Sequence, residues 1–334
     1  MFSEIFKLKE LSAKLGNDLS LIQASGGNTS IKLDGKLWVK ASGKKLKNAL
    51  NEEIFVPLDL IKITNELLIN NSKKELNFKN ICGSSLRASI ETSLHAIMPY
   101  KVVLHTHSVD TIAITLISNS HNYLNKLMKD INWKFIPYFK PGITLAKAIS
   151  KEFQDNPNPA NVLILANHGL VIGEESVEKA EALHKKIISR LKQQPRRQIT
   201  PNIQKLNSII NKIPNSRLPT FEVIHSLATD RQSFKYVQNN SPFPDHLVFC
   251  GRKPLIINND FSFKENTYGI IKGLGVVLFE DSNIATEEML KAQAEVFLRI
   301  PANKNINFLS DKDCDEILNL ESEKYRKKLF FKKT

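Results

Sequence analysis

Apolar and polar positions recur along the first 200 residues with periods that change from one segment to the next. An apolar stripe at every third or fourth position predicts a helix, and alternation or a continuous apolar run predicts a strand. The pattern predicts helices over residues 1–16, 85–97, 111–116 and 145–153. It predicts strands over residues 21–24, 30–33, 36–41, 101–108 and 161–166. This succession of strands and helices is typical of an α/β protein with a central mixed sheet.

The rest of the chain continues the mixture of elements. Strands are predicted over residues 247–250 and 269–279, and helices over residues 286–298 and 310–328. The last of these helices is capped by Ser310 and Asp311 and is rich in charge, so we expect it to face solvent or another subunit.

Residues 272–298 repeat the strand, acidic turn and helix of residues 167–187, with Leu274 where the earlier stretch has His168. We interpret residues 1–200 as a catalytic domain and residues 201–334 as an α/β extension, a degenerate repeat that lacks metal ligands. The alternative is that any strand and helix joined by an acidic turn look this way.

Composition narrows the class of protein. The 334 residues are 42% hydrophobic, enough for one large core or two ordinary ones. No run approaches the roughly 18 apolar residues of a membrane span, and residues 1–16 read as an amphipathic helix rather than a signal peptide. Cys82, Cys250 and Cys314 lie far apart without a Cys-x-x-Cys spacing, which favours reduced thiols. We expect a cytoplasmic protein with no membrane contact.

The net charge of +13 comes from 47 Lys and Arg against 34 Asp and Glu. The basic residues are scattered along the chain rather than gathered into a nucleic-acid footprint. The charge therefore favours attraction of anionic, phosphorylated small substrates over nucleic-acid binding.

Imidazoles occupy the ends of two predicted strands. His105 and His107 stand two residues apart at the end of 101–108, so both leave the same face of the strand. His168 follows strand 161–166, and zinc accepts three or four neutral imidazoles. One such histidine alone would more often be a core residue, but burying three without a shared partner is expensive. We predict a three-histidine site for Zn²⁺ or another divalent metal, with an open position.

Further candidate side chains lie close to these strands in the sequence or point to the same site. Glu91 lies on the predicted helix 85–97, and the short link before the strand brings it within reach of His105 and His107. Asp245 and His246, in the second part of the chain, are the pair that we expect to approach the site from above.

Two polar turns could hold an anion. Residues 25–30 read SGGNTS, and Ser42-Gly43 follows the strand 36–41. Adjacent glycines let backbone N–H groups converge, and hydroxyl and amide groups add donors. The alternative is that the Gly-Gly-Asn turn only joins two strands of a hairpin. Tyr138 lies in a proline-rich loop, where it either does chemistry or packs half buried at an interface.

The order of these motifs resembles the class II aldolase and adducin family, the fold of fuculose- and rhamnulose-phosphate aldolases. The motifs are GGNTS, KASG, a Glu-x-x-x-His helix, HTHS, a Pro-Tyr loop and NHG, within roughly the first 200 residues. RxSxET, LHA, HTHSVD, PDH and IPAN are similar to the aldolase half of predicted bifunctional rhamnulose-phosphate aldolase and alcohol dehydrogenase proteins. No dehydrogenase half follows, because Gly273-Leu274-Gly275 lacks the third glycine of a dinucleotide-binding turn. A nicotinamide-dependent reaction is therefore not expected.

The resemblance implies a three-layer fold, with a largely antiparallel sheet between helices, and a role for each candidate. His105, His107 and His168 look like the zinc ligands, and Glu91 looks like the general acid and base. The positions that match the phosphate site are Asn28, Ser42, Gly43 and Ser89, with Gly27 and Thr29 lining the same turn. Tyr138 matches a tyrosine that a neighbouring subunit donates to protonate the departing aldehyde, which implies a homo-oligomer, by resemblance a tetramer.

The implied reaction is cleavage of a phosphorylated ketose to dihydroxyacetone phosphate and an aldehyde such as lactaldehyde. A Glu91 carboxyl with a raised pKa would suit the proton transfer. Ile90 stands where the small aldolases have a second phosphate-binding serine, and those enzymes lack residues 201–334. The alternatives are a dehydratase, an epimerase or a decarboxylase of the same family, and an adducin-like scaffold, which should lack the three histidines.

Overall fold

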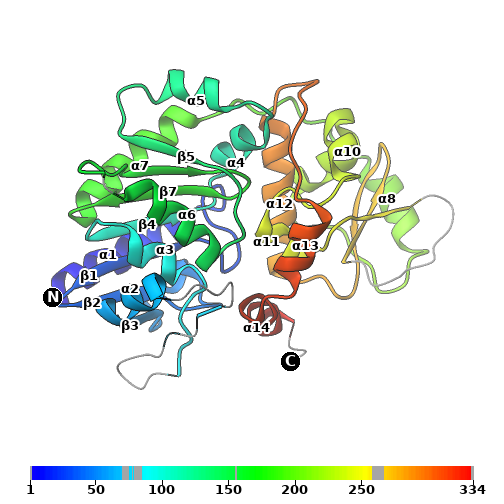
Figure 1. Ribbon diagram of the computed structural model, residues 1–334. Helices are drawn as coiled ribbons and strands as arrows, with labels where there is room; N and C mark the ends of the chain where they lie inside the picture. Colours follow the sequence, from blue (N-terminus) through cyan, green and yellow to red (C-terminus); the bar gives the residue numbers. More distant parts are fainter. Residues whose placement is uncertain are drawn as a thin grey trace.

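A computed structural model describes residues 2–69, 75–76, 78, 85–154, 156–257 and 267–331. Its elements are drawn in Figure 1. The strands are β1 Asn28–Leu33, β2 Lys36–Lys40, β3 Phe55–Asp59, β4 Val102–Thr106, β5 Trp133–Ile136, β6 Val162–Leu165, β7 Gly169–Glu174, β8 Leu255–Ile256, β9 Tyr268–Ile271 and β10 Gly275–Leu278. The α-helices are α1 Phe2–Gly16, α2 Leu60–Ile69, α3 Thr92–Ile97, α4 Val109–Leu116, α5 His121–Leu127, α6 Ile143–Phe153, α7 Val177–Leu191, α8 Ile203–Ile210, α9 Ser226–Thr229, α10 Arg231–Val237, α11 Pro244–Cys250, α12 Ile284–Arg299, α13 Asp311–Leu318 and α14 Glu321–Phe330.

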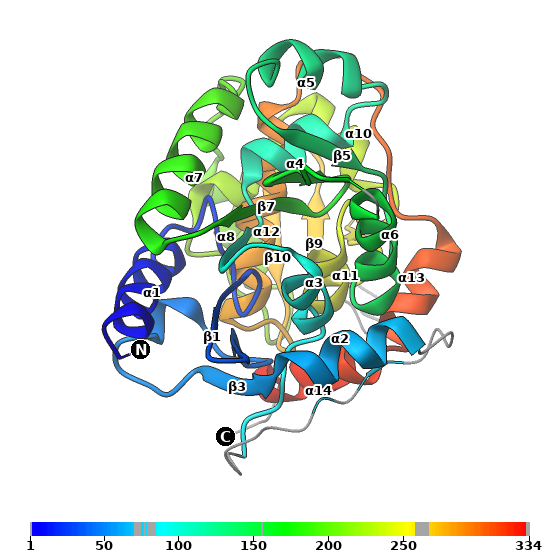
Figure 2. The same ribbon diagram turned by 60° about the vertical axis from the view of Figure 1, so that its left-hand side comes forward.

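A seven-stranded sheet in the order β3-β2-β1-β4-β7-β6-β5 forms the centre of the fold. All neighbouring strands are antiparallel except β5 and β6, which are parallel. Helices α1 and α7 cover one face, and α2, α3 and α6 lie on the other (Figure 2). The predicted three-layer α/β fold with a mixed, largely antiparallel sheet is confirmed.

The side chains of β4 alternate between the two covered faces of the sheet. Val102 and Leu104 pack into the core under α1 and α7, whereas Val103 packs with α3 and α6. This alternation follows from the two-residue period of a strand. It places His105 on the same face as Val103, toward α3.

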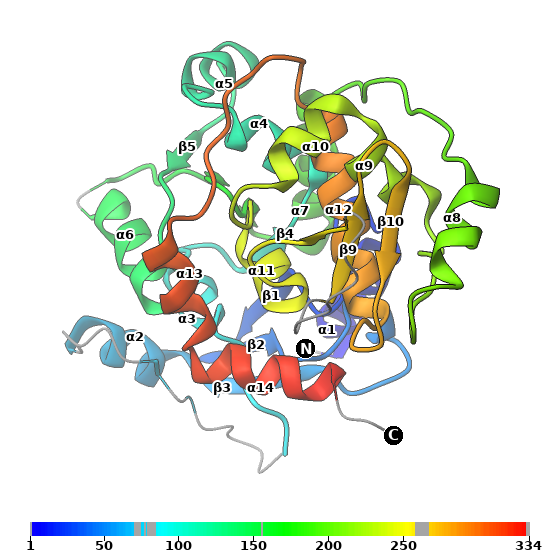
Figure 3. The ribbon, with the colours of Figure 1, turned by 90° about the vertical axis from the view of Figure 1, so that its right-hand side faces the viewer.

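The C-terminal part of the chain, from residue 201 onward, packs against the seven-stranded sheet and its helices, here called the sheet domain. The contact is made through α4, which directly follows β4 in the chain. Val109 and Ile112 of α4 share one apolar cluster with residues of α11 and α12. The three-stranded sheet β10-β9-β8 lies beyond these helices, and α13 and α14 return toward the sheet domain (Figure 3). β9, β10 and α12 repeat the local order of β6, β7 and α7, while the domain boundary and the degenerate repeat stay predictions.

Two of the predicted elements in the first 200 residues differ in the structure. Residues 21–24 are a loop, because the N–H groups of Leu21 and Ile22 both donate to the Asp18 carbonyl at 2.9 Å and close a turn. The predicted helix 85–97 begins only at Thr92, since Ala88 forms an antiparallel bridge with Ala41 after β2. Pairing with another segment therefore takes precedence over local helix preference.

Two C-terminal predictions also need correction. Residues 247–250 belong to the buried helix α11, in which Pro244 occupies the first turn, a position that favours a helix. The helix predicted over 310–328 is two helices, α13 and α14, with a break at Asn319 and Leu320. Ser310 caps α13 as predicted, by accepting a hydrogen bond from the N–H of Asp313 at 3.1 Å.

Two further expectations concern thiols and membranes. Cys250 and Cys314 are buried free thiols, and Cys82 lies outside the described residues. No helix in the described part of the chain combines the length and the apolar character needed to cross a bilayer.

Candidate metal centre

The three histidines converge because β4 pairs with β7, which forms a hairpin with β6. His105 is in register with Val171 of β7, His107 follows the end of β4, and His168 lies in the β6–β7 turn. A Cβ on Gly169 would lie 2.3 Å from the Thr106 carbonyl oxygen. Glycine therefore lets this turn approach the end of β4 closely enough to bring the imidazoles together.

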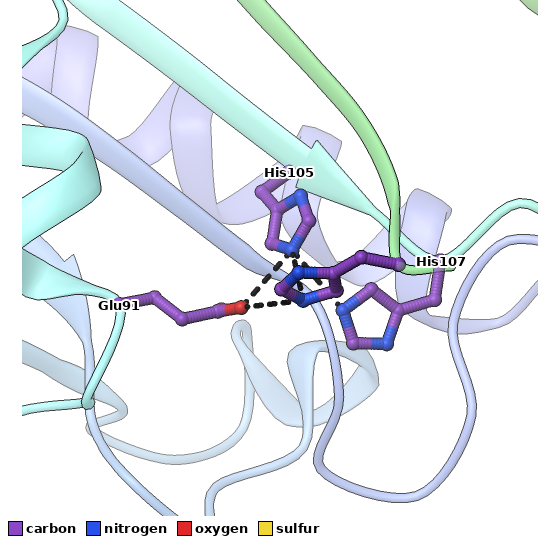
Figure 4. A group of neighbouring side chains, drawn as sticks. Glu91, His105 and His107 are labelled. Carbon is purple, nitrogen blue, oxygen red and sulfur yellow. Dashed lines mark hydrogen bonds and ion pairs between the residues drawn. The ribbon is translucent and has the colours of Figure 1, made fainter. Parts of the chain in front are cut away.

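The ring nitrogens point at a common centre (Figure 4). His105 Nε2 lies 3.1 Å from His107 Nε2 and 3.3 Å from His168 Nε2. Glu91 extends toward them from the turn before α3, with Oε1 at 3.0 Å from His105 Nε2 and 3.3 Å from His168 Nε2. All four side chains are buried, and their ligand atoms lie within 4.8 Å of one another.

This donor set fits a divalent metal. A tetrahedral ion with bonds of about 2.0–2.1 Å holds neighbouring ligand atoms about 3.3 Å apart, close to the 3.1 and 3.3 Å that separate His105 Nε2 from the other two Nε2 atoms. His105 Nδ1 lies 3.0 Å from the Leu170 carbonyl oxygen, an acceptor that fixes the proton on Nδ1 and leaves the Nε2 lone pair free. Three imidazoles and one carboxylate suit zinc and similar ions.

Burial and the Glu91 carboxylate set the charges in the cluster. Burial alone would raise the pKa of Glu91, but His105 and His168 hold it well below its usual range. This direction is opposite to the raised pKa expected from the sequence. Burial lowers the pKa of His168 to about 4, so this imidazole stays neutral at physiological pH. Burial also opposes a charge on His105, yet Glu91 raises its pKa.

A pocket beside the cluster collects three of the predicted phosphate-binding residues. Ser42, Gly43 and Ser89 line it together with Glu91 and His168. Ser42 donates its N–H to the Arg87 carbonyl at 2.9 Å, so the turn after β2 lies beside the segment that carries Ser89. Gly43 has φ of +75°, a conformation that favours glycine.

The other three predicted residues, Gly27, Asn28 and Thr29, are not among the residues that line this pocket. Asn28 accepts a hydrogen bond from the Lys40 N–H at 3.2 Å, and Thr29 shares a hydrogen bond of 2.7 Å with Ser12. Gly27 lies against β4, where a Cβ would stand 3.0 Å from the His105 carbonyl oxygen. Asn28 is in register with His105, so these contacts hold β1 beside β4, and the part of these residues in binding an anion stays a prediction.

Tyr138 is not brought to the histidines of its own chain. Its half-buried ring lines a separate cavity of about 470 Å³ together with Asn167 and Asp313. The phenol oxygen is buried without a hydrogen-bond partner among the described residues, and burial raises its pKa above the usual value. Its action in a neighbouring subunit stays a prediction.

The C-terminal part reaches the cluster through Asp245, whereas His246 turns away. Asp245 Oδ2 lies 3.0 Å from His107 Nδ1, and His246 Nδ1 lies 2.7 Å from Ser241 Oγ instead. Both residues begin α11, and successive positions on a helix face different directions. Of the two residues expected at the site, Asp245 therefore lies there and His246 lies in the core.

Two basic residues of the pocket were not identified from the sequence. Lys40 is 2% exposed, and its Nζ donates to the carbonyl oxygens of Ser25 and Lys44 at 2.9 and 3.0 Å. Arg326 of α14 lines the same pocket and pairs with Glu323 at 2.7 Å. A lysine placed directly before Ala-Ser-Gly was the available signal for the first, while Arg326 is indistinguishable in sequence from its exposed neighbours.

Comparison with known proteins follows the same division of the chain. Residues 7–193, which contain Glu91 and the three histidines, match the Class II Aldolase and Adducin N-terminal domain. The uncharacterized oxidoreductase YuxG of Bacillus subtilis is 32% identical over 189 residues, 52% of this chain but only 27% of that relative. A probable methylthioribulose-1-phosphate dehydratase of Dictyostelium discoideum is 23% identical over 181 residues, 48% of this chain and 74% of that relative.

A solved structure resembles the sheet domain. The N-terminal class II aldolase domain of a conserved protein from Thermoplasma acidophilum superposes with a TM-score of 0.50 and 28% identity, over 57% of this chain and 93% of that one. The shared fold and the family match, which spans more than half of the 334 residues, lead to one assignment. The chain belongs to the class II aldolase and adducin family.

Proposed function

We propose that the protein is a metal-dependent aldehyde-lyase that cleaves a phosphorylated ketose, such as rhamnulose- or fuculose-1-phosphate, to dihydroxyacetone phosphate and an aldehyde. The supporting observation is that Glu91, His105, His107 and His168 converge beside a pocket lined by Ser42, Gly43 and Ser89. Electrophilic and proton-transfer groups thus lie next to donors that suit a phosphate.

In this proposal the three imidazoles and the carboxylate divide the work. The metal, for which Zn²⁺ is our choice, supplies Lewis-acid stabilisation of the negative charge that develops as the carbon–carbon bond breaks. His105, His107 and His168 hold it as neutral ligands. Glu91 moves the proton at the adjacent carbon, because Oε1 is a buried carboxylate oxygen that lies within 3.3 Å of the Nε2 atoms of both His105 and His168.

In the proposal, Ser42, Gly43 and Ser89 bind the phosphate in the pocket that Glu91 and His168 also line. Their hydroxyl and backbone N–H groups position the substrate so that its reacting carbon faces Glu91. Lys40 adds positive charge to the same pocket, which favours an anionic substrate.

A dehydratase is the second candidate. The Dictyostelium relative is named as a probable methylthioribulose-1-phosphate dehydratase, and Ile90 replaces a serine that the aldolase pattern expects. Loss of water from a related sugar phosphate also needs a metal and a base, so the cluster supports both reactions. The Bacillus relative is named an oxidoreductase, but the match covers only 27% of it. We therefore do not propose an oxidation–reduction reaction from that name.

We also propose a cytoplasmic homo-oligomer, a tetramer by family resemblance, in which Tyr138 serves the site of a neighbouring chain. The separation of Tyr138 from the Glu91 pocket of its own chain is compatible with such sharing. Size-exclusion chromatography with light scattering measures the assembly, and a monomer at working concentration would contradict this part of the proposal.

The test of the reaction is a panel of ketose 1-phosphates assayed with a coupled enzyme that consumes dihydroxyacetone phosphate. We expect turnover with at least one ketose phosphate and, when the aldehyde product is measured directly, none with the matching unphosphorylated ketose. Methylthioribulose-1-phosphate, followed by loss of substrate without formation of dihydroxyacetone phosphate, tests the dehydratase. Absence of dihydroxyacetone phosphate from every substrate would exclude the aldolase reaction.

A further inference from the structure

The second ring nitrogen of His107 faces a carboxylate from the C-terminal part of the chain. Nδ1 of His107 lies 3.0 Å from Oδ2 of Asp245, which is 5% exposed in the first turn of α11. Asp245 lies outside residues 7–193, the part that matches the family domain. The contact therefore joins the histidine cluster to a region that the family match does not include.

Asp245 is itself held from the other side. Arg326 of α14 pairs with Oδ1 of Asp245, so the two carboxylate oxygens have different partners. Arg326 also pairs with Glu323 at 2.7 Å, and its guanidinium lies over the ring of Phe249 at 5.4 Å from the centroid. Such contacts on a largely buried arginine leave Asp245 little freedom to rotate.

The turn of residues 25–30 leaves space for Asp245 and His107. A Cβ on Gly26 would lie 2.4 Å from Asp245 Oδ2 and 2.8 Å from His107 Nδ1. Only a residue without a side chain fits at this position. The loop before β1, the end of β4 and the start of α11 thus meet at one contact.

We infer that Asp245 is a positioning residue that orients His107, and that Arg326 holds Asp245 for this task. The inference rests on the metal site of the proposed function. A carboxylate oxygen 3.0 Å from Nδ1 favours the tautomer that carries the proton on Nδ1, in which Nε2 keeps its lone pair toward the cluster. The backbone carbonyl of Leu170 does the same for His105, at 3.0 Å from Nδ1. The C-terminal part is then a component of the metal centre rather than an appendage.

The first experiment measures Zn²⁺ affinity by competition with a chromogenic chelator. Asp245→Asn keeps the shape of the side chain but removes its charge, and Arg326→Met removes the partner of Asp245. We expect each variant to bind Zn²⁺ about 10- to 100-fold more weakly than the wild type. Asp311→Asn is the matched control, because it breaks an exposed ion pair with Arg252 of 3.1 Å elsewhere in the C-terminal part.

The second experiment reads the tautomer of His107 by ¹⁵N NMR in protein stripped of metal. We expect the Nδ1-protonated form in the wild type and a mixture of tautomers in Asp245→Asn. Affinities within twofold of the wild type in both variants, with an unchanged tautomer, would overturn the inference. A wild type that binds no Zn²⁺ would instead overturn the proposed metal site, while the NMR experiment would still test the Asp245 contact.

Discussion

Oε1 of Glu91 lies 3.0 Å from Nε2 of His105, although Glu91 belongs to the turn before α3 and His105 to the central strand β4. The same oxygen lies 3.3 Å from His168 Nε2. One carboxylate oxygen therefore lies against two of the proposed metal ligands, and Glu91 also lines the pocket that would hold the substrate.

Replacing Glu91 by Gln separates metal binding from proton transfer. Gln keeps the size of the side chain but is not a base, so we expect retained metal and a turnover about 10²- to 10⁴-fold lower. Metal content by mass spectrometry and initial rates with the active ketose phosphate measure the two effects. Turnover near the wild-type value would remove Glu91 from the role of proton carrier.

The histidines are tested by metal content. We expect wild-type protein to purify with about one divalent ion per chain, and His105→Ala and His168→Ala to lose it, because each removes one of three imidazole ligands. His184→Ala is the control, since His184 is a buried histidine that pairs with Thr106 Oγ1 at 3.1 Å, outside the cluster. Retained metal in both ligand variants would disprove the site.

Lys40 gives a test of pH dependence. Burial lowers its pKa to about 8 from a usual 10.5, so between these values the unfolded chain binds a proton that the folded chain has released. The free energy of unfolding therefore rises with pH across this window, by about 3 kcal/mol from this group. In Lys40→Met that rise is absent.

Urea unfolding of metal-free wild type and Lys40→Met between pH 8 and pH 10.5 measures the Lys40 contribution as the difference between two slopes. Loss of the bonds to Ser25 and Lys44 changes the stability of the variant at every pH but not the slope. Equal slopes in the two proteins would mean that the buried lysine keeps its ordinary pKa.

Asn167 tests how the residue before His168 supports the site. Its Nδ2 donates to the carbonyl oxygens of Pro242 at 2.9 Å and Asn307 at 3.0 Å, and its φ is +54°. We expect Asn167→Ala to lower the free energy of unfolding by about 2 to 4 kcal/mol, since it removes two hydrogen bonds, one of them to the carbonyl of the buried Pro242, and strains the backbone.

The control at this position is Asn167→Gly. Glycine also lacks the two hydrogen bonds but tolerates a positive φ, so we expect it to be about 1 kcal/mol more stable than the alanine variant. Urea unfolding measures both. Alanine and glycine variants of equal stability would show that the left-handed conformation carries no cost here.

Local pattern was sufficient for much of the sheet domain. β4 and β6 were predicted because continuous apolar runs are typical of strands covered on both faces, and their ends carry the histidines. The helix predicted over 85–97 failed in its first half because Ala88 pairs with Ala41, 47 positions earlier in the chain. Residues 247–250 failed for another reason, since a short buried helix and a short buried strand have the same composition.

The sequence by itself indicated the family, through the resemblance of its motif order. Apolar runs and the strand period of two predicted β4 and β6 and made His105, His107 and His168 candidate ligands, and the short link before β4 made Glu91 a candidate beside them. Only the tertiary structure decided that Asp245 faces His107, that Arg326 holds Asp245, and that Tyr138 lies outside the pocket of its own chain. These relationships join α11, α14 and the loop after β5 to distant segments, and no local periodicity encodes which buried charges will meet. Packing of the C-terminal helices against the sheet domain sets those distances.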